Sequence, residues 1–383
     1  MSVKISFTSK SQTIITIKPN KKLCADTQGV TSFFVFLTIL MKTLLLPISF
    51  LYAIALKIRH KMFDYGIIRS KKFSIPTICI GNLELGGTGK TPLTEYVTRL
   101  LMATDDVAIV SGGYKRKSKG IVIANTNSTL DELGDEPMQY HHKFGDKINV
   151  AVGKDRCQVI GRLIAEKRVS AIILDDALQH RKILSGLNIL TTNFLNPFFN
   201  NHLLPAGTLR DLKSRAKAAD IAVVNKTPDD ATDEQKNHIR REMARYGIQK
   251  VFFASMAYGK PTPCNEIATH SFPDKDSDIV ALCGIAQPDY FMQHIENEFD
   301  AVKKIIFDDH HDFSKNDVET IKKACDDKKI IVTTEKDAMR LTNNHYFSAL
   351  KNVPIYYIPI EVEFDDEASQ FNKEIMDYVR KNN

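Results

Sequence analysis

The chain has 383 residues, enough for two domains, and its 43% hydrophobic and 26% charged residues argue against extensive disorder. A formal net charge of +6 suits an anionic partner but is too small to indicate nucleic acid, and we find no nucleic-acid-binding motif. None of the six cysteines forms a C-x-x-C pair, which indicates buried thiols in a reducing compartment and argues against disulfides or a zinc site.

The most apolar part of the chain lies near its start. Residues 33–41 and 43–56 are apolar runs separated only by Lys42, and a basic cluster runs from Lys57 to Lys72. A membrane-spanning helix, an export signal, a buried core helix and a helix lying in the membrane interface all fit this pattern. We expect the interfacial helix, with the basic residues on the lipid headgroups. Export is disfavoured because the phosphate-binding loop described below needs cytosolic ATP.

After residue 70 short apolar runs alternate with helical stretches such as 91–103 and 155–167. The apolar runs are continuous and rich in β-branched residues, as in strands of a parallel sheet that is covered on both faces. The sequence therefore predicts an α/β fold. The strands of this first set are expected at residues 75–80, 106–110, 148–152, 170–174, 187–191 and 220–224.

A domain boundary is expected within residues 255–277, which are rich in Pro, Thr, Ser and Asp. A second α/β set follows, and Ser314 to Asp317 reads as a capping box that opens a helix. Its strands are expected at residues 278–283, 302–307, 329–333 and 354–358. The predicted organisation is a possible dispensable extension (1–40), a membrane-associated helix (41–62), a P-loop kinase domain (63–265) and a smaller C-terminal α/β domain (275–383).

The segment Gly81 to Tyr96, GNLELGGTGKTPLTEY, resembles the phosphate-binding pattern G-x-x-x-x-G-K-[ST], with Glu84 in place of the first glycine. A predicted strand precedes it and a predicted helix follows, which is the context that the motif requires. Lys90 is expected to reach the β- and γ-phosphates, and the Thr91 hydroxyl to hold Mg²⁺. The predicted nucleotide-binding residues are Glu84, Leu85, Gly86, Gly87, Thr88, Gly89, Lys90 and Thr91.

Residues 171–180, AIILDDALQH, form an apolar run that ends in two aspartates. A strand that ends in Asp beside a phosphate-binding loop is the Walker B arrangement, in which a carboxylate binds Mg²⁺ or its waters. The alternative is an N-cap pair at a strand-to-helix turn. The candidate metal ligands are Thr91, Glu136, Asp175 and Asp176.

Two further acidic patches stand out. GDEP (Gly134–Pro137) places two carboxylates in what reads alone as a solvated turn, and DDHHD (Asp308–Asp312) follows a predicted strand. The second patch fits a metal site, a general base or a polar loop.

Two basic positions also suggest roles. Arg210 follows a Pro-Gly turn, where it could bind a phosphate bidentately or pair with Asp211. The segment Val223–Thr227 is similar to the guanine-reading motif N-K-x-D, but Pro228 stands where that motif has its aspartate, which argues against GTP.

Taken in order, these motifs resemble the tetraacyldisaccharide 4′-kinase family of lipid A biosynthesis, from about residue 41 to the C-terminus. GGTGKT alone is generic, whereas the ordered set is specific, and the family does not keep the first Walker glycine. Two departures are Gly112, where the family more often has arginine, and Ala177, where glycine is usual. The matching motifs are GGTGKTP, S-x-G-Y (Ser111, Gly113, Tyr114), GDEP, VGKDR (Val152–Arg156), DDALQH, LLPAGTLR, GIAQP, DDHHDF and TEKDA (Thr334–Ala338).

The resemblance implies a kinase on the cytoplasmic face of the bacterial inner membrane that uses ATP and Mg²⁺. It implies transfer of the γ-phosphate to the 4′-hydroxyl of a lipid A disaccharide precursor, giving lipid IV A, with the membrane surface as partner and neither nucleic acid nor an obligate protein partner. It also implies that Asp135 and His310 act together as the general base, beside the catalytic Lys90. His311 is the less favoured candidate for the histidine of this pair. The candidate substrate-binding residues are Lys115, Arg116, Gln179, His180 and Arg210.

Two other functions remain as alternatives: a P-loop kinase or ATPase for a soluble substrate, and a nucleotide-binding membrane adaptor without transferase activity. The apolar N-terminus argues against the first, and Asp135 with His310 argues against the second. We further expect Met41 to be the biological start, or residues 1–40 to be dispensable, with helix 43–58 on the membrane and Pro47 in its first turn.

Overall fold

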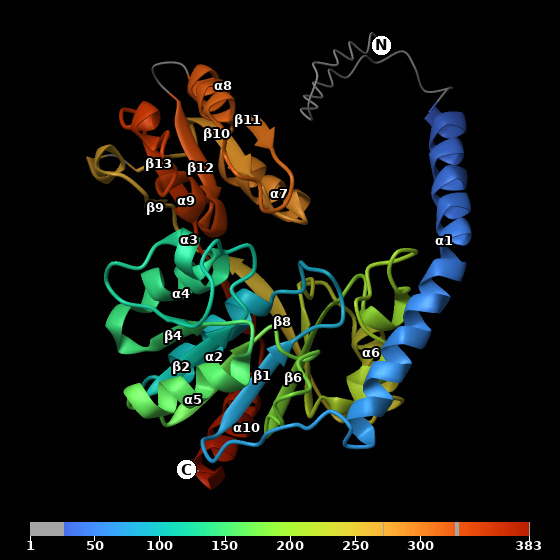
Figure 1. Ribbon diagram of the computed structural model, residues 1–383. Helices are drawn as coiled ribbons and strands as arrows, with labels where there is room; N and C mark the ends of the chain where they lie inside the picture. Colours follow the sequence, from blue (N-terminus) through green and yellow to red (C-terminus); the bar gives the residue numbers. More distant parts are fainter. Residues whose placement is uncertain (1–26, 271, 326–328, 383) are drawn as a thin grey trace.

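The computed structural model describes residues 27–270, 272–325 and 329–382, with side chains described from residue 43 onward. The predicted extension, residues 1–40, therefore lies mostly outside the described part. Two sheets, each covered by helices, are stacked one above the other, and the long helix α1 runs along one side of the larger sheet (Figure 1). This arrangement confirms the predicted α/β fold with a second, smaller α/β unit.

The larger sheet has nine strands in the order β14-β8-β7-β6-β1-β5-β2-β4-β3. The two edge strands, β14 and β3, are antiparallel to their neighbours, and the inner strands are parallel. All six strands predicted in this region are present, and their ends shift by only one or two residues. The strands are β1 (Thr77–Gly81), β2 (Val107–Ser111), β3 (Val122–Ile123), β4 (Asn149–Val152), β5 (Ala171–Asp175), β6 (Leu187–Asn193), β7 (Ile221–Asn225), β8 (Lys250–Tyr258) and β14 (Ile360–Phe364).

Helices cover both faces of this sheet because the inner strands are apolar on both sides. Helices α2, α4 and α10 pack on one face, and α5 and α6 on the other. In α2 the fully buried Leu93, Val97 and Leu101 recur every four residues and form the stripe that faces the sheet. The helices are α2 (Lys90–Leu101), α3 (Leu130–Leu133), α4 (Asp135–Phe144), α5 (Arg156–Glu166), α6 (Asp233–Ala244) and α10 (Ala368–Asn382).

The smaller sheet has five strands in the order β11-β10-β12-β13-β9, parallel except for the edge strand β9. The predicted capping box is confirmed, because Ser314 and Asp317 each accept a hydrogen bond from the other's backbone N–H at the start of α8. The elements are β9 (Thr262–Pro263), β10 (Asp278–Cys283), α7 (Pro288–Glu298), β11 (Ala301–Ile306), α8 (Lys315–Cys325), β12 (Ile330–Thr334), α9 (Glu335–Thr342) and β13 (Ile355–Ile358).

The chain crosses between the two sheets twice. It leaves the larger sheet after Tyr258 and returns at Ile360, where β14 pairs with β8. Helix α10 then packs on the larger sheet. Sheet pairing thus places residues 360–382 with the first unit, whereas the sequence analysis assigned them to the second. The alternating exposure of β14 is that of an edge strand, and sequence order alone does not say which sheet such a strand joins.

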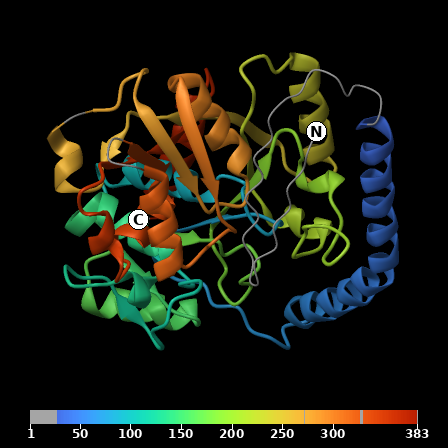
Figure 2. The same cartoon turned by 90° about the horizontal axis from the view of Figure 1, so that it is seen from above.

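Helix α1 spans Thr27–Asp64. It is longer than the predicted membrane-associated segment, residues 41–62, and than the helix expected within it, residues 43–58. Pro47 therefore lies inside the helix, and the expectation that it sits in the first turn is wrong because the helix begins upstream. Figure 2 shows that α1 bends along its length, as helices with an interior proline commonly do.

One face of α1 is attached to the body of the protein and the other is open. Ser49 and Tyr52 donate hydrogen bonds to the carbonyls of Leu203 and Arg210, over 3.0 and 2.9 Å. Among the described residues, Thr43–Asp64 is the one helix long and apolar enough to cross a membrane, by length and composition. The exposed apolar side chains of this face are Leu44, Leu46, Ile48, Phe50, Leu51, Ile54 and Ile58.

Candidate active site

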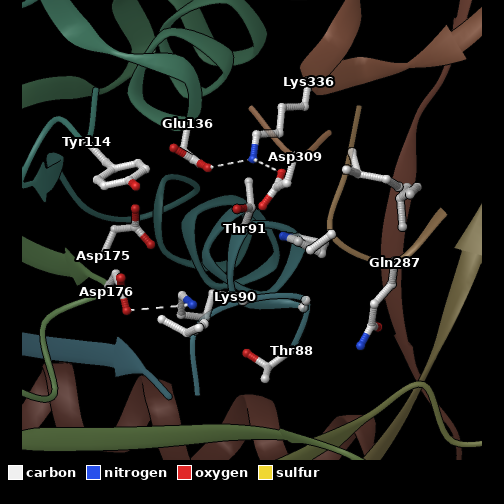
Figure 3. Close-up of a pocket in the computed structure, with 18 of the residues that line it drawn as sticks. Thr88, Lys90, Thr91, Tyr114, Glu136, Asp175, Asp176, Gln287, Asp309 and Lys336 are labelled. Carbon is white, nitrogen blue, oxygen red and sulfur yellow. Dashed lines mark hydrogen bonds and ion pairs between the residues drawn. The ribbon is translucent and has the colours of Figure 1, made fainter. Parts of the chain in front are cut away.

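The carboxyl ends of the parallel strands in both sheets face one cavity of about 1240 Å³. On the larger sheet the loops that follow β1, β5 and β7 line it, and on the smaller sheet the loops that follow β10, β11 and β12. Ligands of open α/β sheets bind at this edge. Two sheets thus contribute to a single site, and Figure 3 shows the central part of its lining.

The glycine-rich loop joins β1 to α2 and is fixed from two sides. Gly87 and Gly89 have φ of +73° and +78°, a conformation that favours glycine. A Cβ on Gly89 would lie 2.6 Å from Asn225 Nδ2, which itself donates to the Thr88 carbonyl over 2.7 Å. These contacts hold the loop so that the N-terminus of α2 faces the cavity. A helix N-terminus is a favourable place for an anion.

Glu84 departs from its predicted role. All the other predicted nucleotide-binding residues line the cavity, but Glu84 is buried behind the loop. Its Oε1 accepts a hydrogen bond of 2.8 Å from Asn201, and Leu85 N donates to the Thr208 carbonyl over 3.0 Å. Burial raises the pKa of Glu84. The side chain in place of the Walker glycine thus holds the loop against the segment around Asn201 and Thr208 and is not part of the cavity lining.

Two neighbouring carboxyl groups end β5, beside β1 in the sheet. Lys90 Nζ lies 3.6 Å from Asp176 Oδ1, and Figure 3 shows the contact. Burial, with the nearby charge of Asp176, raises the pKa of Asp175 to about 7. Burial would also raise the pKa of Asp176, but Lys90 and Arg210 outweigh it and hold that pKa well below its usual range. The pKa values of the two carboxyl groups therefore shift in opposite directions although the residues are adjacent in sequence.

The candidate metal ligands all line the cavity. Thr91, Glu136, Asp175 and Asp176 offer hydroxyl and carboxylate oxygens, the donors that Mg²⁺ prefers (Figure 3). Among the described residues no three His, Cys, Asp or Glu side chains are close enough to form a metal site by themselves. The set therefore fits a Mg²⁺ ion that is also held by substrate phosphates, which is usual in phosphoryl transfer.

Asp135 and His310 come from different units and meet beside the cavity. Asp135 begins α4, so the GDEP segment is a helix start and not the solvated turn that its sequence alone suggests. His310 follows β11, and its Nδ1 lies 2.6 Å from Asp135 Oδ2. Burial would raise the pKa of Asp135, but hydrogen bonds from His310 and Arg340 hold it well below its usual range. His311 instead lies 2.9 Å from Asp317, which leaves His310 as the partner of Asp135.

Helix α9 brings two cations to this pair. Arg340 donates to Asp135, and Lys336 Nζ donates to His310 Nε2 over 2.9 Å. Arg340 also lies 2.7 Å from His310 Nδ1, so this ring nitrogen faces both the Asp135 carboxylate and the guanidinium. Lys336 also contacts Glu136 at 3.2 Å and Asp309 at 3.4 Å (Figure 3). The TEKDA motif was the sequence signal for Lys336, but the motif by itself gave it no role.

The predicted substrate-binding residues separate into two groups. Lys115, Gln179, His180 and Arg210 line the cavity, whereas Arg116 lies outside the lining and donates to the Gly120 carbonyl. Burial lowers the pKa of His180 to about 4, and its Nε2 has no hydrogen-bond partner among the described residues. A half-buried imidazole whose Nε2 is buried without a partner is suited to a polar group of a ligand.

Arg210 binds its neighbours in the site and not Asp211. It donates to Asp176 through both terminal nitrogens and to Asn82 Oδ1 over 2.6 Å. Asp211 is fully buried and lies 2.6 Å from His60 of α1. The Arg210 guanidinium therefore lies against Asp176, a candidate metal ligand. The next residue, Asp211, connects the same loop to helix α1 through His60.

A further group of lining residues was not predicted. Lys226 donates to Gln287 and lies 4.5 Å from the centre of the Tyr290 ring. Burial lowers the pKa of Lys226 to about 8. The N-K-x-D-like segment and the GIAQP turn contain two of these residues, so the sequence held a signal, but only the fold brings β7 and α7 together.

Comparison with known proteins gives a consistent result. A family model described as tetraacyldisaccharide-1-P 4′-kinase matches residues 41–380. Proteins named tetraacyldisaccharide 4′-kinase are similar over most of their length: that of Phocaeicola vulgatus is 40% identical over 88% of this chain and 95% of its own. That of Flavobacterium johnsoniae is 38% identical over 90% of this chain and 98% of its own. The crystal structure of LpxK from Aquifex aeolicus in complex with ATP superimposes with a TM-score of 0.65 and 26% identity, over 88% of this chain and 99% of that one.

Proposed function

The chain belongs to the tetraacyldisaccharide 4′-kinase family, and from this premise we propose how its cavity transfers phosphate. The enzyme is an ATP-dependent kinase that phosphorylates the 4′-hydroxyl of tetraacyldisaccharide 1-phosphate to give lipid IV A. The observation that carries the proposal is a hydrogen-bonded Asp135–His310 pair at the same cavity as the P-loop lysine.

The larger sheet holds the phosphate donor. Backbone N–H groups of the loop and the start of α2 bind the phosphates of ATP, and Lys90 stabilises the charge on the β- and γ-phosphates. Lys90 now lies 3.6 Å from Asp176, so an anion entering the loop competes with a carboxylate for it. Mg²⁺, held by Thr91 with Asp175, Asp176 or Glu136, would neutralise phosphate charge there.

The acceptor is activated from the other side. His310 Nε2 takes the proton of the 4′-hydroxyl as its oxygen bonds to the γ-phosphorus and the bond from phosphorus to the ADP oxygen breaks. Asp135, which contacts His310 Nδ1, orients the ring and stabilises the imidazolium that forms. Lys336 now donates to Nε2 and must move from it before the proton transfer.

The lipid precursor is expected to bind between the P-loop and α1. The exposed apolar face of α1 suits acyl chains and the inner leaflet, and Arg59 of the same helix lines the cavity with Gln179 and Arg210. We place the enzyme on the cytoplasmic face, where ATP is available. Changing Leu44, Ile48 and Leu51 together to serine should reduce co-sedimentation with anionic phospholipid vesicles. Unchanged binding would contradict an interfacial role for this face.

One assay tests the proposed function. Purified protein, γ-labelled ATP, Mg²⁺ and tetraacyldisaccharide 1-phosphate in detergent should give a labelled lipid. Label released only as inorganic phosphate would support an ATPase, and bound nucleotide without either product would support the adaptor. Transfer to a soluble sugar but not to the lipid would support the soluble-substrate kinase.

A further inference from the structure

A buried lysine away from the reacting groups joins three helices. Lys143 of α4 places its Nζ 2.6 Å from Glu95 Oε2 of α2 and 2.9 Å from Glu335 Oε2 of α9. The side chains of Lys143, Glu95 and Glu335 are only 16%, 1% and 7% exposed. Gln139 of α4 donates to the other oxygen of Glu95 over 2.8 Å. The contact thus connects the helices of the larger sheet with α9 of the smaller one at the edge of the cavity, which Gln139 and Glu335 also line.

Each of the three helices carries part of the active site. Helix α2 begins with Lys90, and α4 begins with Asp135. Helix α9 carries Lys336 and Arg340, which contact His310 and Asp135. The relative position of the three helices therefore determines how the phosphate donor, the base and the two cations face one another.

The chemistry of the contact points to a positioning role more than to stability. Two carboxylates share one lysine, and removing these charges from water costs free energy that an apolar cluster would not. Burial raises the pKa of Glu95, and the lysine partly offsets this rise. Two hydrogen-bonded partners of Lys143 on different helices also fix a distance and direction that apolar contacts leave free. Such a contact suits a position where the relative placement of the helices matters more than the free energy that the contact adds to folding.

We propose that Lys143 is a positioning residue for the phosphate transfer. By binding Glu95 and Glu335 together, it holds α9 against α2 and α4, so that His310 and Lys336 meet Asp135 at the cavity. The inference rests on the proposed role of the Asp135–His310 pair as base.

The test compares Lys143→Met with wild type in the lipid kinase assay. A misplacement of about 1 Å in a site of this kind costs up to about 100-fold, so kcat should fall roughly 10- to 100-fold. The P-loop contacts remain, so the apparent KM for ATP should change by less than about threefold. Lys143→Arg keeps both ion pairs and should restore most of kcat. Glu335→Gln, which removes only the partner on α9, should lower kcat as well.

Two controls separate positioning from instability. Lys143→Met leaves Glu95 and Glu335 without their lysine, so the triple variant Glu95→Gln/Lys143→Met/Glu335→Gln should recover thermal stability while kcat stays low. Recovery of kcat in that variant would overturn the proposal. Lys250→Met breaks a 2.6 Å ion pair with Glu374 that lies within the larger unit, and it should leave kcat unchanged. Hydrogen exchange should speed up in α9 and not in α10 of Lys143→Met.

A cycle with the base separates this inference from the proposed function. If Lys143 acts by placing His310, Lys143→Met should cost little more in a His310→Ala background, because the group that it positions is absent. Additive losses, or a normal kcat for Lys143→Met beside an impaired His310→Ala, would overturn the inference alone. A normal kcat for His310→Ala would overturn the base assignment and the inference with it.

Discussion

The two walls of the cavity are built in different ways. On the larger sheet, the P-loop and the Asp175–Asp176 pair follow adjacent parallel strands, with Ile80 directly opposite Asp175. On the smaller sheet, His310 follows β11 and Lys336 lies on α9, and both meet the larger unit where α9 packs on α4. The phosphate-donor wall is held by hydrogen bonds within one unit, whereas the acceptor wall depends on how two units meet. Variants in the two walls should therefore fail differently.

The largest effect is expected at the contact between the walls. Asp135→Ala and His310→Ala should each lower kcat by about 10²- to 10⁴-fold, the usual contribution of a general base, while ATP affinity is kept. The double variant should lose little more than the worse single one, because a pair acting as a unit is non-additive. Steady-state kinetics with directly measured ATP binding checks this. Fully additive losses would show that Asp135 and His310 do not act together as the base. The contrast between the two walls would then have no catalytic basis.

Variants in the phosphate-donor wall should lose activity because they no longer stabilise the charge on the phosphates of ATP. Lys90→Ala should lower kcat by about 10²- to 10³-fold, since Lys90 stabilises phosphate charge that develops during transfer. The decrease should persist in a His310→Ala background, because the two residues act on different reactants. Phosphate transfer by Lys90→Ala at nearly the wild-type rate would remove the P-loop interpretation.

Arg210 tests whether the donor wall also serves the acceptor. If it binds a substrate phosphate, Arg210→Lys should raise the apparent KM for the lipid roughly tenfold, because lysine cannot reproduce bidentate binding. The matched measurement is the KM for ATP, which should stay near its wild-type value. An unchanged lipid KM would leave Arg210 as a structural partner of Asp176.

The smallest effect is a pH dependence within the donor wall. The folded protein keeps a proton on Asp175 up to about pH 7, whereas its usual pKa is 3.8. The free energy of unfolding should thus decrease as pH rises from about 4 to about 7, because the unfolded chain releases that proton earlier. Asp175→Asn should reduce this slope in denaturant titrations. A slope equal to that of wild type would contradict a raised pKa at Asp175.

Protonation of Asp175 should also weaken the binding of Mg²⁺ by the enzyme. A protonated carboxyl is a poor metal ligand, so the Mg²⁺ concentration for half-maximal activity should rise as pH falls below about 7. Mg²⁺ titrations of wild-type activity at pH 6 and pH 8 measure this. Equal half-maximal concentrations would indicate that Asp176 or Glu136, and not Asp175, carries the ion.

Much of the donor wall could be predicted because its signals are contiguous. A β-branched run, a glycine-rich loop and an amphipathic helix follow one another, so Lys90 and Thr91 were placed from local chemistry alone. The loop pattern does not show that the Glu84 side chain turns toward Asn201 and away from the cavity. Lys336 and Arg340 received no role, since their partners are far away in the sequence.

The sequence by itself determined the fold class, the P-loop, the pair of carboxyl groups at the end of β5 and ten of the fourteen described strands, all but β3, β8, β9 and β14. Hydrophobic periodicity, helix capping and turn chemistry act over a few residues, and these features need nothing more. Only the tertiary structure decided that residues 360–382 return to the larger sheet, that His310 rather than His311 meets Asp135, and that Lys143 joins α2, α4 and α9. Each of these depends on contacts between segments far apart in the chain, and such contacts are set by how the two sheets and their helices pack.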